Sequence, residues 1–308
     1  MSSTETSNKN DLSFEAKSRL LHLATYASVA TALVLIVTKL VAWFLTGSVS
    51  ILASLVDSVM DSVASLINLA AVRYSLQPPD AEHRFGHGKA ESLAGLAQAA
   101  FICGSAIFLV LHAIDRIRFP HAVEELTIGI GVMLVAIVLT LGLLAIQKHV
   151  VARTGSTAIK ADALHYTTDV FTNASIIAAL YLSSLGWSWA DPVFAIIIAI
   201  YIFYSAIQIG TEAFQLLMDR ELPEDVQQQI IDIALGHHKV RGIHDLKTRQ
   251  SGQTRFVQIH VEMDDDLPLI QAHQVADEVE AAINVVMPDA EILIHQDPFS
   301  IKDAKLTL

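Results

Sequence analysis

The segment Leu55-Val-Asp-Ser-Val-Met-Asp-Ser62 places two carboxylates, Asp57 and Asp61, inside an apolar stretch that runs from about residue 49 to residue 74. A bilayer core of about 30 Å needs about 20 helical residues to cross it, and this stretch is long enough. The spacing of four puts both acids on one helix face. A charged side chain at membrane depth costs at least about 2.5–3.5 kcal/mol, so it marks a functional site by default. The segment therefore predicts a membrane helix that carries a polar site.

The rest of the chain supports a membrane protein. Of its 308 residues, 53% are hydrophobic and only 17% are charged, against about 25% in ordinary soluble domains. A single cysteine, Cys103, rules out an intramolecular disulfide. Six stretches are long and apolar enough to be spanning helices, at about 24–45, 49–74, 92–114, 126–147, 161–185 and 190–210.

The remaining third of the chain has a different composition. Residues 1–210 carry 12 Lys and Arg against 14 Asp and Glu, whereas residues 211–308 carry 8 against 18. Without a basic surface, nucleic-acid binding is not expected. The pattern predicts helices at 223–238 and 269–286, and strands at 242–249, 255–263 and 291–295. This αββαβ order predicts an open-sheet α+β domain with both helices on one face.

Orientation follows from the distribution of Lys and Arg beside the spans. Nine lie in the N-terminal tail and in the second and fourth loops, and two lie on the other side. The positive-inside rule therefore predicts that both termini are cytosolic. We expect a cytosolic tail at 1–23, a six-helix membrane domain at 24–210, a linker at 211–222 and a cytosolic domain at 223–308.

A second polar pair lies in the fifth span. His165 and Asp169 are four residues apart, as Asp57 and Asp61 are. Three carboxylates and one imidazole form a complete four-coordinate set for Zn²⁺ or a similar divalent ion. The alternative, a polar network that only packs helices, explains one acid better than two matched pairs. Lys39, near the end of the first span, is expected to extend to the interface and is assigned no function.

A third group lies on the polar loop between spans two and three. Asp80, His83 and His87 fall within eight residues, and Gly86 and Gly88 allow a tight turn. This spacing suits a shallow metal site, although a solvated, histidine-rich loop would look the same. The loop lacks the phosphate-loop spacing, so nucleotide binding and an ATP-driven pump are not expected.

These motifs together resemble the cation diffusion facilitator family, and most of all its bacterial zinc and ferrous-iron efflux transporters. The likeness rests on the acids of span two, on His165-x-x-x-Asp169, and on His83-Arg-Phe-Gly-His-Gly-Lys-Ala-Glu91. It implies a homodimer in the bacterial inner membrane, a transport site formed by the four intramembrane residues, and a second metal on the loop.

The resemblance also implies roles for residues that spacing alone does not assign. Lys89 and Asp219 match a charge interlock between the two domains of the dimer, and Leu164 matches an apolar gate. Five tail residues match a paired metal site in which Asp297 can bridge two ions: His244, His260, His273, His295 and Asp297.

The leading functional hypothesis is efflux of a divalent metal, Zn²⁺ and also Cd²⁺ or Fe²⁺, by proton-coupled antiport with alternating access. The metal would be the substrate, and in the loop and tail a structural or regulatory ion. A membrane metallohydrolase is disfavoured because no H-E-x-x-H segment is present, so we predict no enzyme activity. A metal-gated cation channel or a metal sensor remains an alternative.

Overall fold

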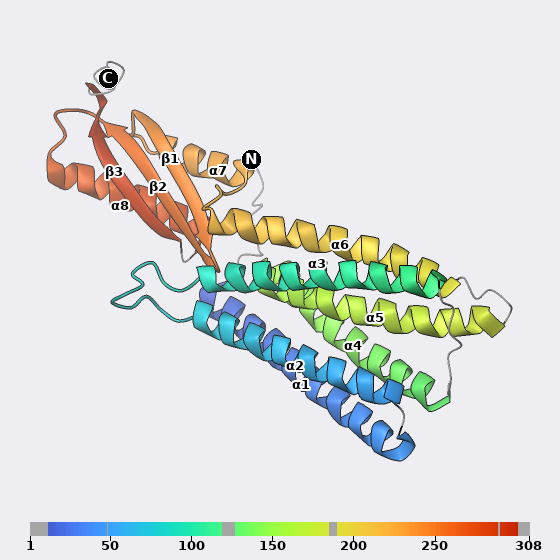
Figure 1. The fold of residues 1–308 in the computed structure, drawn as a ribbon. Coiled ribbons are helices and arrows are strands. Elements are labelled where there is room, and N and C mark those ends of the chain that lie inside the picture. Colours follow the sequence, from blue (N-terminus) through green and yellow to red (C-terminus); the bar gives the residue numbers. More distant parts are fainter. Residues whose placement is uncertain (1–11, 48, 119–126, 185–189, 289, 301–308) are drawn as a thin grey trace, which may run out of the picture. The chain divides into compact units, whose positions relative to one another are not determined.

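The structure, a computed structural model, describes residues 12–47, 49–118, 127–184, 190–288 and 290–300 (Figure 1). It divides into two compact units, one of residues 18–214 and the other built mainly from residues 215–308.

In the described part of the first unit, all the regular secondary structure is helical. Its six helices coincide with the six predicted spans and run beyond most of them, because a helix does not end where its apolar core ends. They are α1 (Phe14–Thr46), α2 (Val49–Ser75), α3 (Lys89–Arg118), α4 (Thr127–Thr154), α5 (Thr157–Ser184) and α6 (Ala190–Leu217).

Five of these helices are long and apolar enough to cross a membrane. Over its described residues α5 is not apolar enough to be included among these five, because it carries Lys160, Asp162, His165 and Asp169. Large apolar side chains are exposed all along the unit, among them Phe44, Leu45, Phe108 and Val138. Such a surface suits lipid rather than water. The chain is therefore a multi-pass helical membrane protein.

The polar helix α5 lies among the others and packs against α2, α3 and α4. A tight turn sets its start. Gly155 follows α4 with a φ of 65°, a conformation that glycine adopts without strain. Ser156 then accepts a hydrogen bond from the N–H of Ile159 at 3.2 Å and caps α5. The turn places the face of α5 that bears His165 and Asp169 inside the bundle.

The second unit has the predicted αββαβ order. It contains α7 (Glu224–Leu235), β1 (Gly242–Ser251), β2 (Thr254–Met263), α8 (Leu269–Val286) and β3 (Glu291–Pro298). The strand order is β1-β2-β3, with β1 antiparallel and β3 parallel to the central β2. The predicted fold class is therefore confirmed.

Alternation along β2 separates the two faces of this sheet. Val257, Ile259, Val261 and Met263 all belong to the core that α7 and α8 cover. Successive strand residues point to opposite faces. His260 consequently lies on the other face.

Three element boundaries differ from the predicted ones. The helix α6 continues to Leu217, which lies within the segment 211–222 predicted as a linker. The last strand extends past residue 295 to Pro298, so that Asp297 lies within β3 opposite Glu262. In addition, α1 begins at Phe14, within the segment predicted as an N-terminal tail.

Candidate functional site

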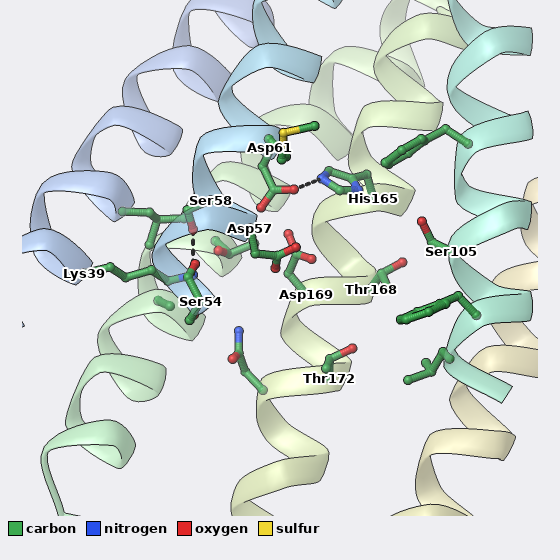
Figure 2. Close-up of a pocket in the computed structure, with 18 residues that line it drawn as sticks. Lys39, Ser54, Asp57, Ser58, Asp61, Ser105, His165, Thr168, Asp169 and Thr172 are labelled. Carbon is green, nitrogen blue, oxygen red and sulfur yellow. Dashed lines mark hydrogen bonds and ion pairs between the residues drawn. The ribbon is translucent and has the colours of Figure 1, made fainter. Parts of the chain in front are cut away.

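The polar residues of α2 and α5 meet at one cavity of about 270 Å³ within the helical unit (Figure 2). Asp61, His165 and Asp169 each offer a ligand atom there, and these atoms lie within 4.8 Å of one another. His165 Nε2 is 3.0 Å from Asp61 Oδ1. The side chains of Asp61 and His165 are only 16% and 12% exposed. Three of the four predicted intramembrane ligands are thus brought together.

The fourth predicted ligand, Asp57, is not in that close group. It lines the same cavity and its carboxylate lies beside that of Asp169 in Figure 2.

Lys39 also lines this cavity, and here the expectation of an interfacial lysine was wrong. Its Nζ donates hydrogen bonds to Ser58 Oγ at 2.6 Å and to the Ser54 carbonyl at 3.1 Å. The residue is only 8% exposed. The long, flexible lysine side chain can place its ammonium group either at the interface or in the cavity, so the sequence alone did not determine its position.

Sequence reasoning gave no role to Asp162, one turn before His165. Asp162 is wholly buried. Its carboxylate accepts hydrogen bonds at 2.7 Å from Gln147 Nε2 and at 3.2 Å from Gln98 Nε2, and lies 2.7 Å from Ser28 Oγ. These partners belong to α4, α3 and α1, so the network ties α5 to three neighbours. The rule that singles out Asp57, an acid in an apolar span, would also have singled out Asp162.

Leu164, the predicted gate residue, lies between Asp162 and His165 in the sequence of α5. It is buried in an apolar cluster that includes Ile102 of α3 and Ile202 of α6.

The loop residues form a second group of metal-type ligands. Asp80 Oδ2 is 3.2 Å from His87 Nε2, and Asp80 Oδ1 is 3.4 Å from His83 Nδ1. All three offer ligand atoms within 4.8 Å of one another. Hydrogen bonds from the backbone N–H of His83 and of Glu82 lower the pKa of the Asp80 carboxyl. Asp80 is therefore anionic at neutral pH, as binding a cation requires.

The loop backbone is shaped to present these side chains. Gly86 adopts a φ of 76°, and its N–H donates to the His83 carbonyl at 3.0 Å. The His87 ring packs edge-on against Tyr74 at 4.5 Å. Tyr74 belongs to α2, and this contact with the helix explains why His87 is buried while Asp80 and His83 are exposed.

The tail contains a third group, on the sheet face opposite the helices. Strand register sets His260 beside His244 on one side and beside His295 on the other. Asp297 Oδ2 is 2.7 Å from His260 Nδ1 and 3.3 Å from His244 Nε2, and Asp297 Oδ1 is 3.2 Å from His295 Nε2. Four of the five predicted tail residues thus converge.

His273 lies apart from these four residues within the described part of this chain, and its predicted role as a ligand stays a prediction. It lies near the start of α8, 3.6 Å from Asp277 one turn later, and the metal-type groups found among the described residues do not include it. Two acids that the sequence did not flag stand by the cluster instead. Asp245 groups with His244 and His260, and the buried Glu262 lies 3.0 Å from His244 Nδ1.

The predicted pair of Lys89 and Asp219 spans the two units and stays a prediction. Within its own unit, Asp219 lies 3.3 Å from Arg249 Nη1.

The geometry defines a membrane transport protein with a carboxylate-rich cation site among its helices and a small α+β domain outside them. Residues 25–218 match the family model described as the cation efflux transmembrane domain, and residues 222–299 match the cation efflux protein, cytoplasmic domain. The chain belongs to the cation diffusion facilitator, or cation efflux, family.

Relatives with curated names agree. The chain is 54% identical to the "Cation-efflux pump FieF" of Klebsiella pneumoniae over 286 residues, which covers 93% of this chain and 95% of the relative. It is also 54% identical to the protein of that name in Salmonella arizonae, over 92% and 94% of the two chains. A solved MamM CTD matches 24% of this chain and 95% of that chain at 25% identity, with a TM-score of 0.24. The named relatives are transporters, and this chain is accordingly a transporter and not an enzyme.

Proposed function

We propose that this protein exports a divalent metal ion, Zn²⁺ first, from the cytosol by exchanging it for protons through alternating access. The observation that carries the proposal is the convergence of Asp61, His165 and Asp169 within 4.8 Å inside the membrane unit. Asp57 lines the same cavity, and in this proposal it would be the fourth ligand.

The ligand types favour particular ions. One imidazole among carboxylates suits Zn²⁺, Cd²⁺ or Fe²⁺ better than Mn²⁺, which prefers oxygen ligands throughout. A site without thiolate also suits an ion that must be released again. The order of intrinsic affinities places Zn²⁺ above Fe²⁺.

Proton exchange follows from the same ligands. Metal binding requires ionised carboxylates and a neutral imidazole, so protons and metal compete for the same atoms. Three ionised carboxylates around one cavity repel each other, which favours proton uptake when the metal leaves. If access alternates between the two faces, an inward proton gradient drives the metal outward. The apolar packing of Leu164 against α3 and α6 suits a gate on this path.

The groups outside the membrane would bind metal without lying on the transport path. The loop trio of Asp80, His83 and His87 and the tail cluster around His260 are proposed as a regulatory and a structural site, respectively. The matched cytoplasmic domain supports a homodimer, in which Lys89 and Asp219 would interlock. We further propose the bacterial inner membrane as the location, with both termini cytosolic.

A metal-gated channel or a metal sensor is the second candidate, favoured by the two ligand groups outside the membrane. Proteoliposomes that hold a pH-sensitive dye separate the two. Antiport predicts Zn²⁺ flux that moves protons the other way and responds to a pH gradient at zero metal gradient. Zn²⁺ flux without proton counter-movement would refute antiport, and Asp61→Ala is the control that identifies flux through the membrane site.

A further inference from the structure

Lys39 is a buried cation beside the proposed transport site, and export by itself does not require it. Figure 2 shows it reaching from α1 toward α2, on the side of the cavity where Asp57 lies. The charge of Lys39 is within electrostatic range of Asp57, Asp169 and Asp61. An ammonium group at this depth is costly, so its presence calls for a functional explanation.

The hydrogen bonds of Lys39 hold its ammonium group to one side of the acids. Both partners, the Ser58 hydroxyl and the Ser54 carbonyl, belong to α2 and are neutral. Within the described ranges, no carboxylate forms an ion pair with Lys39. The Lys39 ammonium group therefore occupies none of the ligand oxygens, while its positive charge lies at the same cavity.

Charge counting then gives the lysine a role. Three carboxylates and a neutral imidazole carry −3, and Lys39 reduces this charge to −2. Resting on the proposed function, we propose that Lys39 is a fixed counter-charge that makes the transport site electrically neutral when it holds one divalent ion.

Neutrality matters because, in alternating access, the metal-loaded site must switch from facing one side of the membrane to facing the other, within a medium of low dielectric constant. A net charge there is expensive, so a neutral loaded site moves more easily than one of charge −1. The lysine also repels the bound cation and weakens its affinity, which speeds release. A monovalent ion would leave the site at −1, so the same charge favours divalent cargo.

Removal of the charge should thus tighten binding and slow transport together. Lys39→Gln removes the charge and keeps a hydrogen-bond donor on a side chain that is one atom shorter, whereas Lys39→Met removes both the charge and the donor. Lys39→Arg keeps the charge. Lys148→Met is the matched control, because it removes an exposed lysine at the end of α4, away from the cavity.

The test uses the full-length protein with Zn²⁺ as the probe. Binding is measured in detergent, and the share of the membrane site is defined as the part that Asp61→Ala abolishes. We expect Lys39→Gln and Lys39→Met to bind Zn²⁺ at that site about tenfold more tightly. In proteoliposomes the KM for Zn²⁺ should fall, the maximal rate should fall several-fold, and the rate should become more dependent on membrane voltage.

Lys39→Arg and Lys148→Met should stay within about threefold of the unmodified protein in every measurement. Unchanged or weaker Zn²⁺ binding in the neutral variants would overturn the inference, as would an equal effect of Lys148→Met. A purely structural lysine predicts lower activity with no gain in affinity and no new voltage dependence. If the unmodified protein moves no Zn²⁺ at all, export is refuted, but the binding measurements still decide the role of Lys39.

Discussion

Substitution of His260 should remove both halves of the tail site in one step. His260 belongs to both groups of ligand atoms, the one with His244 and Asp245 and the one with His295 and Asp297. The change to test is therefore His260→Ala, compared with His244→Ala and His295→Ala, each of which leaves the other group intact.

The magnitude follows from binding linkage. A ligand at about 100 times its Kd stabilises the folded state by about 2.7 kcal/mol per site. In a domain of about 60–100 residues, each kcal/mol shifts the Tm by about 4–8 °C. One occupied group should therefore raise the Tm of the tail by about 10–20 °C, and two groups by more.

The assay is thermal unfolding of a tail fragment that begins just before Leu222, with and without Zn²⁺. The fragment includes the core formed by α7, α8 and the sheet, so it should fold by itself. We expect His260→Ala to lose nearly the whole Zn²⁺-dependent shift and the two other variants to lose about half. His238→Ala, an exposed histidine outside both groups, is the control. A full shift in His260→Ala would refute the shared-ligand geometry, and an unmodified tail that ignores Zn²⁺ would refute the site.

Three further outcomes are expected in the membrane unit. His165→Asp replaces the imidazole by oxygen and should raise Mn²⁺ flux relative to Zn²⁺ flux by about tenfold, since Mn²⁺ prefers oxygen ligands; parallel flux assays with both ions check this, and an unchanged ratio removes His165 from selectivity. Protons compete with Zn²⁺ for the ligands, so the apparent Zn²⁺ affinity of the site should fall about tenfold or more as the pH drops from about 7.5 to about 5.5. Competition binding at the two pH values measures this change. Asp57→Ala should abolish the linked proton movement while the tail still binds Zn²⁺. Asp162→Ala leaves Gln147 and Ser28 without their shared partner and should destabilise the bundle by about 1–3 kcal/mol. Thermal unfolding in detergent should show this loss of stability, and Asp162→Asn should recover part of it. Equal stability of the unmodified protein and both variants would contradict the network.

Apolar length and the spacing of polar residues were enough to predict the helices and the two candidate pairs. Runs of about 20 apolar residues have few alternatives to a spanning helix. In the tail, strict alternation around His260 predicted a strand, because a shift of one residue would expose Val257 and Ile259.

The parts that sequence did not predict depend on how the helices are rotated against each other. The donors to Asp162 come from positions 15, 64 and 134 residues away along the chain. No local pattern relates such positions. Similarly, four-residue spacing places Asp57 and Asp61 on one face, but packing decides that Asp61 rather than Asp57 meets His165.

The three ligand groups differ in a way that suits different tasks, and the difference lies in their ligands and their surroundings. The membrane group is dominated by carboxylates, and the apolar helices around it leave only a small fraction of Asp61 and His165 exposed. Repulsion among these carboxylates favours binding of a cation, and in the proposed exchange the same acids would accept protons when the cation leaves, which would make binding reversible. The tail group contains three imidazoles that strand pairing holds in register, and no helix has to move for it to form. A metal ion bound there would be held by the folded sheet itself, and its binding energy would add to the stability of the domain. We therefore infer that the site built for exchange is the one among the helices, and that the site built for retention is the one on the sheet.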